Sequence, residues 1–114
     1  MKKIFIIVIC IFIKQFCFAQ SQMEMNQQAF ADYKKADAKM TALYKKVQKI
    51  IADPKEKSLL LEAQRTWTKF KEAHCRSISA AEQGGTIYPL IYTTCLQQLT
   101  EDRIIQLKIY LKTF

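Results

Sequence analysis

The sequence predicts an all-α protein, a three-helix up-down-up bundle with one disulfide joining helices two and three. Three observations predict this fold. Glycine and proline number two each in 114 residues, and they lie around positions 54 and 84–89, where helices are expected to end. Apolar residues recur at three- and four-residue steps through three long segments. Finally, Cys75 and Cys95 lie at equal distances from Gly85.

The N-terminus has the pattern of a secretory signal peptide. Lys2 and Lys3 precede an unbroken apolar run over residues 4–13, and Ala19 provides a small residue at the cleavage point. About ten apolar residues are typical of an export signal, whereas a membrane-spanning helix needs roughly twenty. We therefore predict a signal peptide over residues 1–19 and one domain over residues 20–114, exported to the periplasm or secreted.

Two alternatives remain open for this segment. Lys14 interrupts the region before the cleavage site, and Cys17 occupies the third-last position where alanine is usual, so an uncleaved anchor is one alternative. Acylation of Cys10 or Cys17 is a weaker one, because neither cysteine follows the small residues that lipoprotein processing prefers.

Cleavage after Ala19 changes both the charge and the cysteine content. The full chain has 18 basic and 10 acidic residues, and the signal peptide contains three of the lysines, so the mature domain has a net charge of +5. Only Cys75 and Cys95 remain, in a compartment where disulfides persist, which allows one intramolecular bridge. A domain of this size has little surplus stability and benefits from such a staple.

Three helices follow from the periodicity and the helix-ending residues. We expect the first over about 27–52, ending at Asp53-Pro54, the second over about 55–83, ending at the glycine pair, and the third over about 88–112. The predicted apolar stripe of the first is Phe30, Tyr33, Met40, Leu43, Tyr44, Val47, Ile50 and Ile51. The stripe of the second is Leu60, Ala63, Trp67, Phe70, His74 and Ile78, and that of the third is Tyr88, Tyr92, Cys95, Leu96, Leu99, Leu107 and Tyr110. Three one-sided helices must bury their stripes against each other.

The cysteine spacing supports this topology independently. If helices two and three form an antiparallel hairpin that turns at Gly84-Gly85, residues equally far from the turn lie side by side. Cys75 and Cys95 are both ten residues from Gly85. We therefore predict a disulfide between them, as a rung of the hairpin.

Few residues could carry catalysis. His74 is the only histidine and lies in the second apolar stripe, which favours a packed, hydrogen-bonded core position over a base or a metal ligand. No nucleophile motif or glycine-rich phosphate loop is present, and the two mature cysteines are better matched to each other than to a metal. We therefore predict no enzymatic activity, no cofactor and no bound metal. Export also disfavours nucleic acid as a partner.

Arg103 is the most informative polar residue, because it falls within the apolar arc of the third helix. A charge in that place needs a partner. The up-down-up topology places Arg103 at the level of Trp67 and Tyr44, with Asp37 one turn away, so we predict a cluster of these four residues with the guanidinium near the indole and reaching the carboxylate. The cluster has two interpretations: a polar core that fixes helix register, or the floor of a ligand site.

A lysine face is the other charged feature. On a helical wheel, six lysines of the first helix fall within an arc of about 140° that is separate from the apolar stripe. They are Lys34, Lys35, Lys39, Lys45, Lys46 and Lys49. The face is either simply solvated or a docking surface for an anionic partner such as lipid headgroups, lipopolysaccharide or an acidic protein.

A resemblance covers essentially the whole mature chain. Its residues are the run Leu61-Glu62-Ala63-Gln64-Arg65-Thr66-Trp67 with Phe70, Ala73 and Cys75, then Cys95-Leu96, Leu99-Thr100, Arg103 and Leu107. In the first helix, Asp37, Met40, Thr41 and Tyr44 stand where members usually have Asp, Leu, Asn and Tyr. The chain resembles the LprI-type lysozyme inhibitors, a family of bacterial secreted domains. The resemblance implies a helical bundle in the periplasm or cell envelope and, by the family's name, lysozyme inhibition. The expected partner is then a lysozyme or another envelope protein.

Two departures from the family pattern qualify this implication. Members often carry a further cysteine pair near the start of the domain, but residues 23–28 contain none, and Thr41 replaces the usual asparagine. The charge matters as well. Many animal lysozymes are basic, so a domain of net charge +5 would approach them against electrostatic repulsion.

Overall fold

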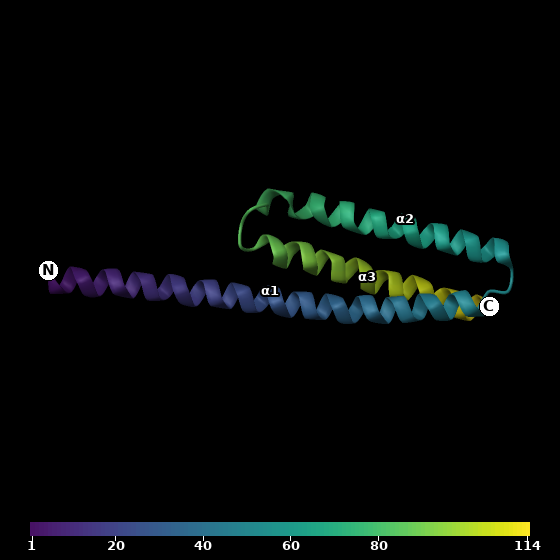
Figure 1. The fold of residues 1–114 in the computed structure, drawn as a ribbon, viewed down its shortest axis with the longest axis horizontal. Helices are drawn as coiled ribbons and strands as arrows, with labels where there is room; N and C mark the ends of the chain where they lie inside the picture. The colour runs from purple at the N-terminus through teal and green to yellow at the C-terminus, as the bar shows by residue number, and fades with distance from the viewer.

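The computed structural model describes residues 1–114 and contains three α-helices and one short 3-10 helix. These are α1 (Lys2–Ile50), α2 (Pro54–Ser79), η1 (Ala80–Glu82) and α3 (Tyr88–Thr113). Figure 1 shows that α1 and α3 run in one direction and α2 in the opposite direction. The prediction of an all-α, up-down-up three-helix bundle with a disulfide between helices two and three is confirmed.

The first helix is much longer than the bundle, and its N-terminal part projects beyond the other two helices (Figure 1). This part is apolar, with a mean hydropathy of 2.1 over an 18-residue window, and none of that window is buried. By length and composition it could cross a membrane, a test that signal sequences also pass. Packing begins at buried Gln22, and Asn26 Nδ2 donates to the Thr86 carbonyl. The bundle therefore starts before the predicted residue 27.

The helix ends follow from local chemistry. The Asp53 carboxylate caps α2 by accepting from the backbone N–H of Glu56 at 3.2 Å, and Pro54 occupies the first turn, where a missing N–H costs nothing. At the other end of α2 the chain turns through Gly84, whose φ of 84° favours glycine. Pro89 lies in the first turn of α3. All three ends lie within a few residues of the predicted ones.

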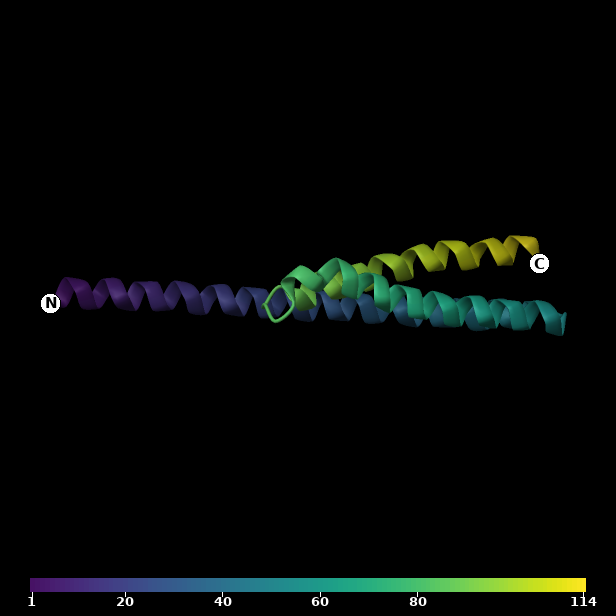
Figure 2. The same cartoon turned by 90° about the horizontal axis from the view of Figure 1, so that it is seen from above.

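The central helix of the packing is α3, which lies against both α1 and α2. Between α1 and α2, side chains meet at Met40 and Gln64 and at Tyr33 and Lys71. Figure 2 shows α3 diverging from α1 toward its C-terminus. Near the turn, small buried residues such as Ala29, Ala36 and Thr93 allow the backbones to come close. Where the helices diverge, larger side chains fill the space. This core consists of Met40, Val47, Ile51, Leu60, Ile104 and Leu107.

The three predicted apolar stripes agree with the observed burial to different extents. Every member of the third stripe is buried or half-buried, as predicted. In the second, Ala63, Phe70 and Ile78 are exposed, so this stripe was wrong in part. The buried residues of α2 are instead Leu60, Lys71, Cys75 and Ser79. Residues four apart are 40° beyond a full turn from each other. The line that joins these buried residues therefore rotates around the helix toward its C-terminus. In the first stripe, Phe30 and Ile50 are exposed.

Candidate functional site

A buried arginine joins α2 to α3 at the middle of the bundle. Arg103 is 8% exposed, and its Cζ lies 5.9 Å from the centroid of the Trp67 ring. Its Nε donates to Gln64 Oε1 at 3.0 Å, and its Nη1 donates to Gln106 Oε1 at 3.0 Å. Gln64 in turn contacts α1 by donating from Nε2 to Met40 Sδ at 3.1 Å. The group therefore links all three helices.

The guanidinium has no anionic partner in this environment. Nη2 of Arg103 is buried without a hydrogen-bond partner, and the two acceptors are neutral amides. Burial lowers the pKa of Arg103 from its ordinary value, while Tyr110 and Tyr44 act in the opposite direction. A buried charge without a counter-ion favours a role in helix register over a role in stability.

The predicted contact between Arg103 and Asp37 is wrong. The Asp37 carboxylate instead lies 3.9 Å from Nζ of Lys71, and its side chain is 44% exposed. The rotation of α2 brings Lys71 to the α1 side, where its ammonium is closer to Asp37 than the guanidinium is. The Trp67 ring is close to both cations, with its centroid 4.6 Å from Lys71 Nζ and 5.9 Å from Arg103 Cζ.

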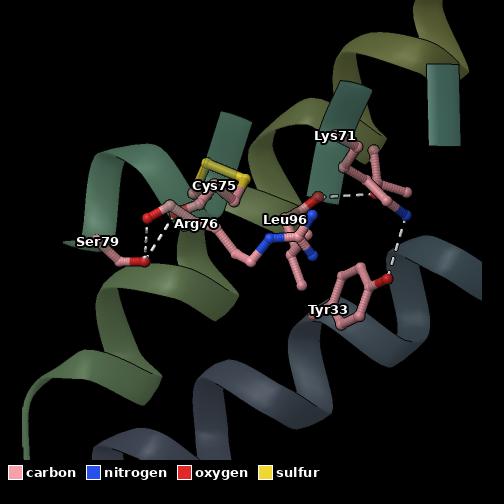
Figure 3. The surroundings of a disulfide bond; sticks show 8 residues. Tyr33, Lys71, Cys75, Arg76, Ser79 and Leu96 are labelled. Carbon is pink, nitrogen blue, oxygen red and sulfur yellow. Dashed lines mark hydrogen bonds between the residues drawn. A yellow bond between two sulfur atoms is a disulfide. The ribbon is translucent and has the colours of Figure 1, made fainter. Parts of the chain in front are cut away.

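Lys71 is the residue that sequence reasoning missed. It is 4% exposed, and Nζ donates to the Tyr33 hydroxyl at 3.1 Å while lying 5.2 Å from the centroid of the Tyr33 ring. Figure 3 shows this hydrogen bond beside the disulfide. The signal was present in the spacing, because Trp67, Lys71 and Cys75 follow each other at steps of four.

Two other residues of the predicted signature lie outside this cluster. Tyr44 is half-buried at the edge of the core, and its hydroxyl accepts from Gln48 Nε2 at 2.8 Å. Arg65 is exposed on α2. The cluster at the centre therefore consists of Gln64, Trp67 and Arg103, with Lys71 beside it.

The disulfide lies where the cysteine spacing placed it. Cys75 of α2 and Cys95 of α3 are bonded, with 5.6 Å between their Cα atoms. Figure 3 shows the bond spanning the two helices, with Ser79 one turn further along α2. The Ser79 hydroxyl is buried and donates to the Cys75 carbonyl at 2.7 Å, which satisfies it within its own helix.

All six predicted lysines of α1 are exposed. Lys35 and Lys39 also border a groove of about 470 Å³ between α1 and α3, together with Lys108 and the acidic residues Asp32 and Glu101. The lysine face is therefore accessible, and part of it adjoins a shallow hollow of mixed charge.

A second accessible surface lies on the α2–α3 hairpin. His74, predicted to be a hydrogen-bonded core residue, is instead half-buried here and stacks on exposed Phe70 with 5.2 Å between ring centroids. The groove at this place has a volume of about 530 Å³ and includes Ile78, Leu99 and Asp102 in its lining. No group of three or more histidine, cysteine, aspartate or glutamate side chains is arranged to hold a metal ion here.

The family of this chain follows from a match to a protein-family model. The model of the family described as "Lysozyme inhibitor LprI" matches residues 17–107. The chain belongs to the LprI family. The match covers the disulfide, the cluster around Arg103 and all three helices of the bundle. The family resemblance drawn from the Gln64-Arg65-Thr66-Trp67 run is therefore confirmed.

One relative of this LprI domain is an uncharacterised protein of Rhizobium meliloti (strain 1021). It is 31% identical, over 79% of this chain and 73% of the relative. No solved structure matches the chain. The printed description of the family names a lysozyme inhibitor.

Proposed function

We propose that residues 20–114 form an exported inhibitor that binds a lysozyme and blocks it without catalysing a reaction. The observation that carries this proposal is the family match, which covers residues 17–107 and so most of the bundle. The architecture supports it, because a disulfide-stapled bundle presents preformed surfaces and loses little conformational entropy on binding.

The buried cluster does not serve as the floor of a ligand site in this proposal. Arg103 and Lys71 are 8% and 4% exposed, so a partner would reach neither without opening the bundle. We assign the cluster to helix register. Recognition is left to the exposed surfaces.

Export is the first testable part of the proposal. We expect mass spectrometry of the protein recovered from the periplasm or the medium to give a chain that begins at Gln20 and contains one internal disulfide. The exposed apolar segment at the start of α1 supports a signal sequence. Full-length protein in the membrane fraction would favour the uncleaved anchor, and free thiols at Cys75 and Cys95 would contradict the staple.

Inhibition is the second part. We expect the purified mature domain to reduce the rate of cell-wall lysis by at least one lysozyme in a panel of basic and acidic enzymes, at a stoichiometric ratio and with a measurable dissociation constant. Assays at two salt concentrations separate specific binding from charge attraction, because exposed charges are screened within about 8 Å at physiological salt. Lack of inhibition and of binding across the panel would contradict the proposal.

A second candidate function follows from the lysine face, whose six exposed ammonium groups lie on one side of α1. In this case the domain docks on an anionic envelope surface. Binding to anionic vesicles that is lost in the Lys35→Glu, Lys46→Glu, Lys49→Glu triple variant, with no binding to any lysozyme, favours this candidate. Unchanged helicity and melting temperature of the triple variant provide the folding control.

A further inference from the structure

Three large apolar side chains of α2 are exposed beside the line of buried residues. Leu59, Phe70 and Ile78 are 57%, 53% and 55% exposed. They are exposed because the line of contact with α3 rotates toward Cys75 and Ser79, both 0% exposed, and leaves the neighbouring positions outside. Clustered exposed apolar residues are a common mark of an interaction site.

Two hollows flank Phe70 on this surface. The first, of about 530 Å³, lies between α2 and α3 over the disulfide, and its lining includes His74, Ile78, Cys95 and Asp102. The second, of about 600 Å³, includes Leu59, Ala63 and Trp67. Phe70 borders the second hollow and stacks on His74 of the first, so it forms an aromatic ridge between them. We call this surface the Phe70 face.

The charged residues that line the Phe70 face are opposite in sign to the net charge of the molecule. Asp102 is the one carboxylate that lines the first hollow and Glu62 the one that lines the second, and no lysine or arginine lines either. Both carboxylates are exposed. In contrast, the groove between α1 and α3 is lined by three lysines and two acidic residues, Asp32 and Glu101.

We propose that the Phe70 face is the surface that contacts the inhibited lysozyme, and that the enzyme presents to it a basic surface with apolar side chains. This inference rests on the proposed function and assigns its contact surface and the charge of its partner. The geometry joins an aromatic anchor, two hollows that accept side chains of the partner, and a carboxylate in each hollow.

The assignment removes the conflict between the net charge of +5 and a basic target. Net charge governs the approach of two proteins at long range, whereas complementarity of the groups in contact governs how long the complex lasts. A basic enzyme approaches this domain slowly and is retained by Glu62 and Asp102. Added salt screens the net repulsion, so we expect the association rate to rise with salt.

The test compares variants in binding to a basic animal lysozyme, measured by surface plasmon resonance. Phe70→Ala should weaken the affinity by at least about 30-fold, the size typical of a central aromatic anchor. The Glu62→Lys, Asp102→Lys double variant should weaken it by at least about tenfold, mainly through faster dissociation. All three residues are exposed, so the fold should persist, and circular dichroism checks this.

A matched control separates the local contact from the total charge. Glu24→Lys with Glu82→Lys makes the same change in net charge at exposed positions that line neither hollow. Its affinity should stay within about threefold of the unmodified domain at physiological salt. Equal losses for the two charge variants, or a Phe70→Ala variant that binds as tightly as the unmodified domain, would overturn the assignment while leaving inhibition intact. An unmodified domain that binds no lysozyme overturns the proposed function itself, and the inference with it.

Discussion

Replacing both bridging cysteines by alanine should lower the free energy of unfolding of the mature domain by about 3 kcal/mol. The bridge closes a loop of 20 residues, and restricting the unfolded chain by a loop of about this length contributes roughly that amount. The effect is large for this fold, because the exposed side chains of Phe70 and Ile78 contribute little buried apolar area to the packing of α2 against α3. Urea unfolding followed by circular dichroism measures the change.

Reduction of the unmodified domain provides the control for this experiment. It breaks the same bond without removing side-chain atoms, so the loss of stability should agree with that of the alanine variant to within about 1 kcal/mol. A loss below 1 kcal/mol in both measurements would mean that the bundle holds α2 in place without the bridge.

Arg103→Ala should lower the free energy of unfolding by about 2–5 kcal/mol, the range found when a large buried side chain is truncated. The truncation leaves a cavity beside Trp67 and removes the donor to Gln64 Oε1. Arg103→Met should stay within about 1 kcal/mol of the unmodified domain, since it keeps the apolar stem and removes a buried charge that has no counter-ion. Thermal and urea unfolding of both variants tests this.

Double-mutant cycles identify the partner of Arg103. Arg103→Ala combined with Gln64→Ala should deviate from additivity by about 0.5–3 kcal/mol, because the two side chains are in contact. The combination with Asp37→Ala should be additive within about 0.5 kcal/mol. A strong coupling to Asp37 would place the guanidinium on the carboxylate and contradict the observed pairing of Asp37 with Lys71.

The cluster illustrates how far the candidate site could be predicted. Arg103 and Trp67 were recognised because an arginine within an apolar arc and a tryptophan at the same level of the next helix are visible in the sequence. The choice of partner was wrong, because it depends on the rotation of α2 about its own axis. That rotation places Lys71 near Asp37 and leaves Gln64 for Arg103. Lysine is rarely buried, so the four-residue spacing of Trp67, Lys71 and Cys75 was not enough to mark Lys71 as a core residue.

The sequence by itself determined the number and direction of the helices, the two connections between them and the disulfide. These features follow from local patterns: periodicity, the Asp53-Pro54 stop, the glycine turn, and the equal spacing of Cys75 and Cys95 about it. Each depends on residues that are close in the chain or equally far from the same hairpin turn. The packing of side chains between helices is therefore not needed to predict them.

Only the tertiary structure decided which face of α2 is buried. Phe70 and Ile78 have the apolar character of core residues, yet Cys75 and Ser79 occupy the interface instead. A step of four residues rotates the contact line by 40° and a step of three by 60° in the opposite sense, and the apolar pattern of α2 is compatible with either course. The closeness of α3, to which the disulfide joins α2 at Cys75, selects between them and leaves Phe70 in solvent.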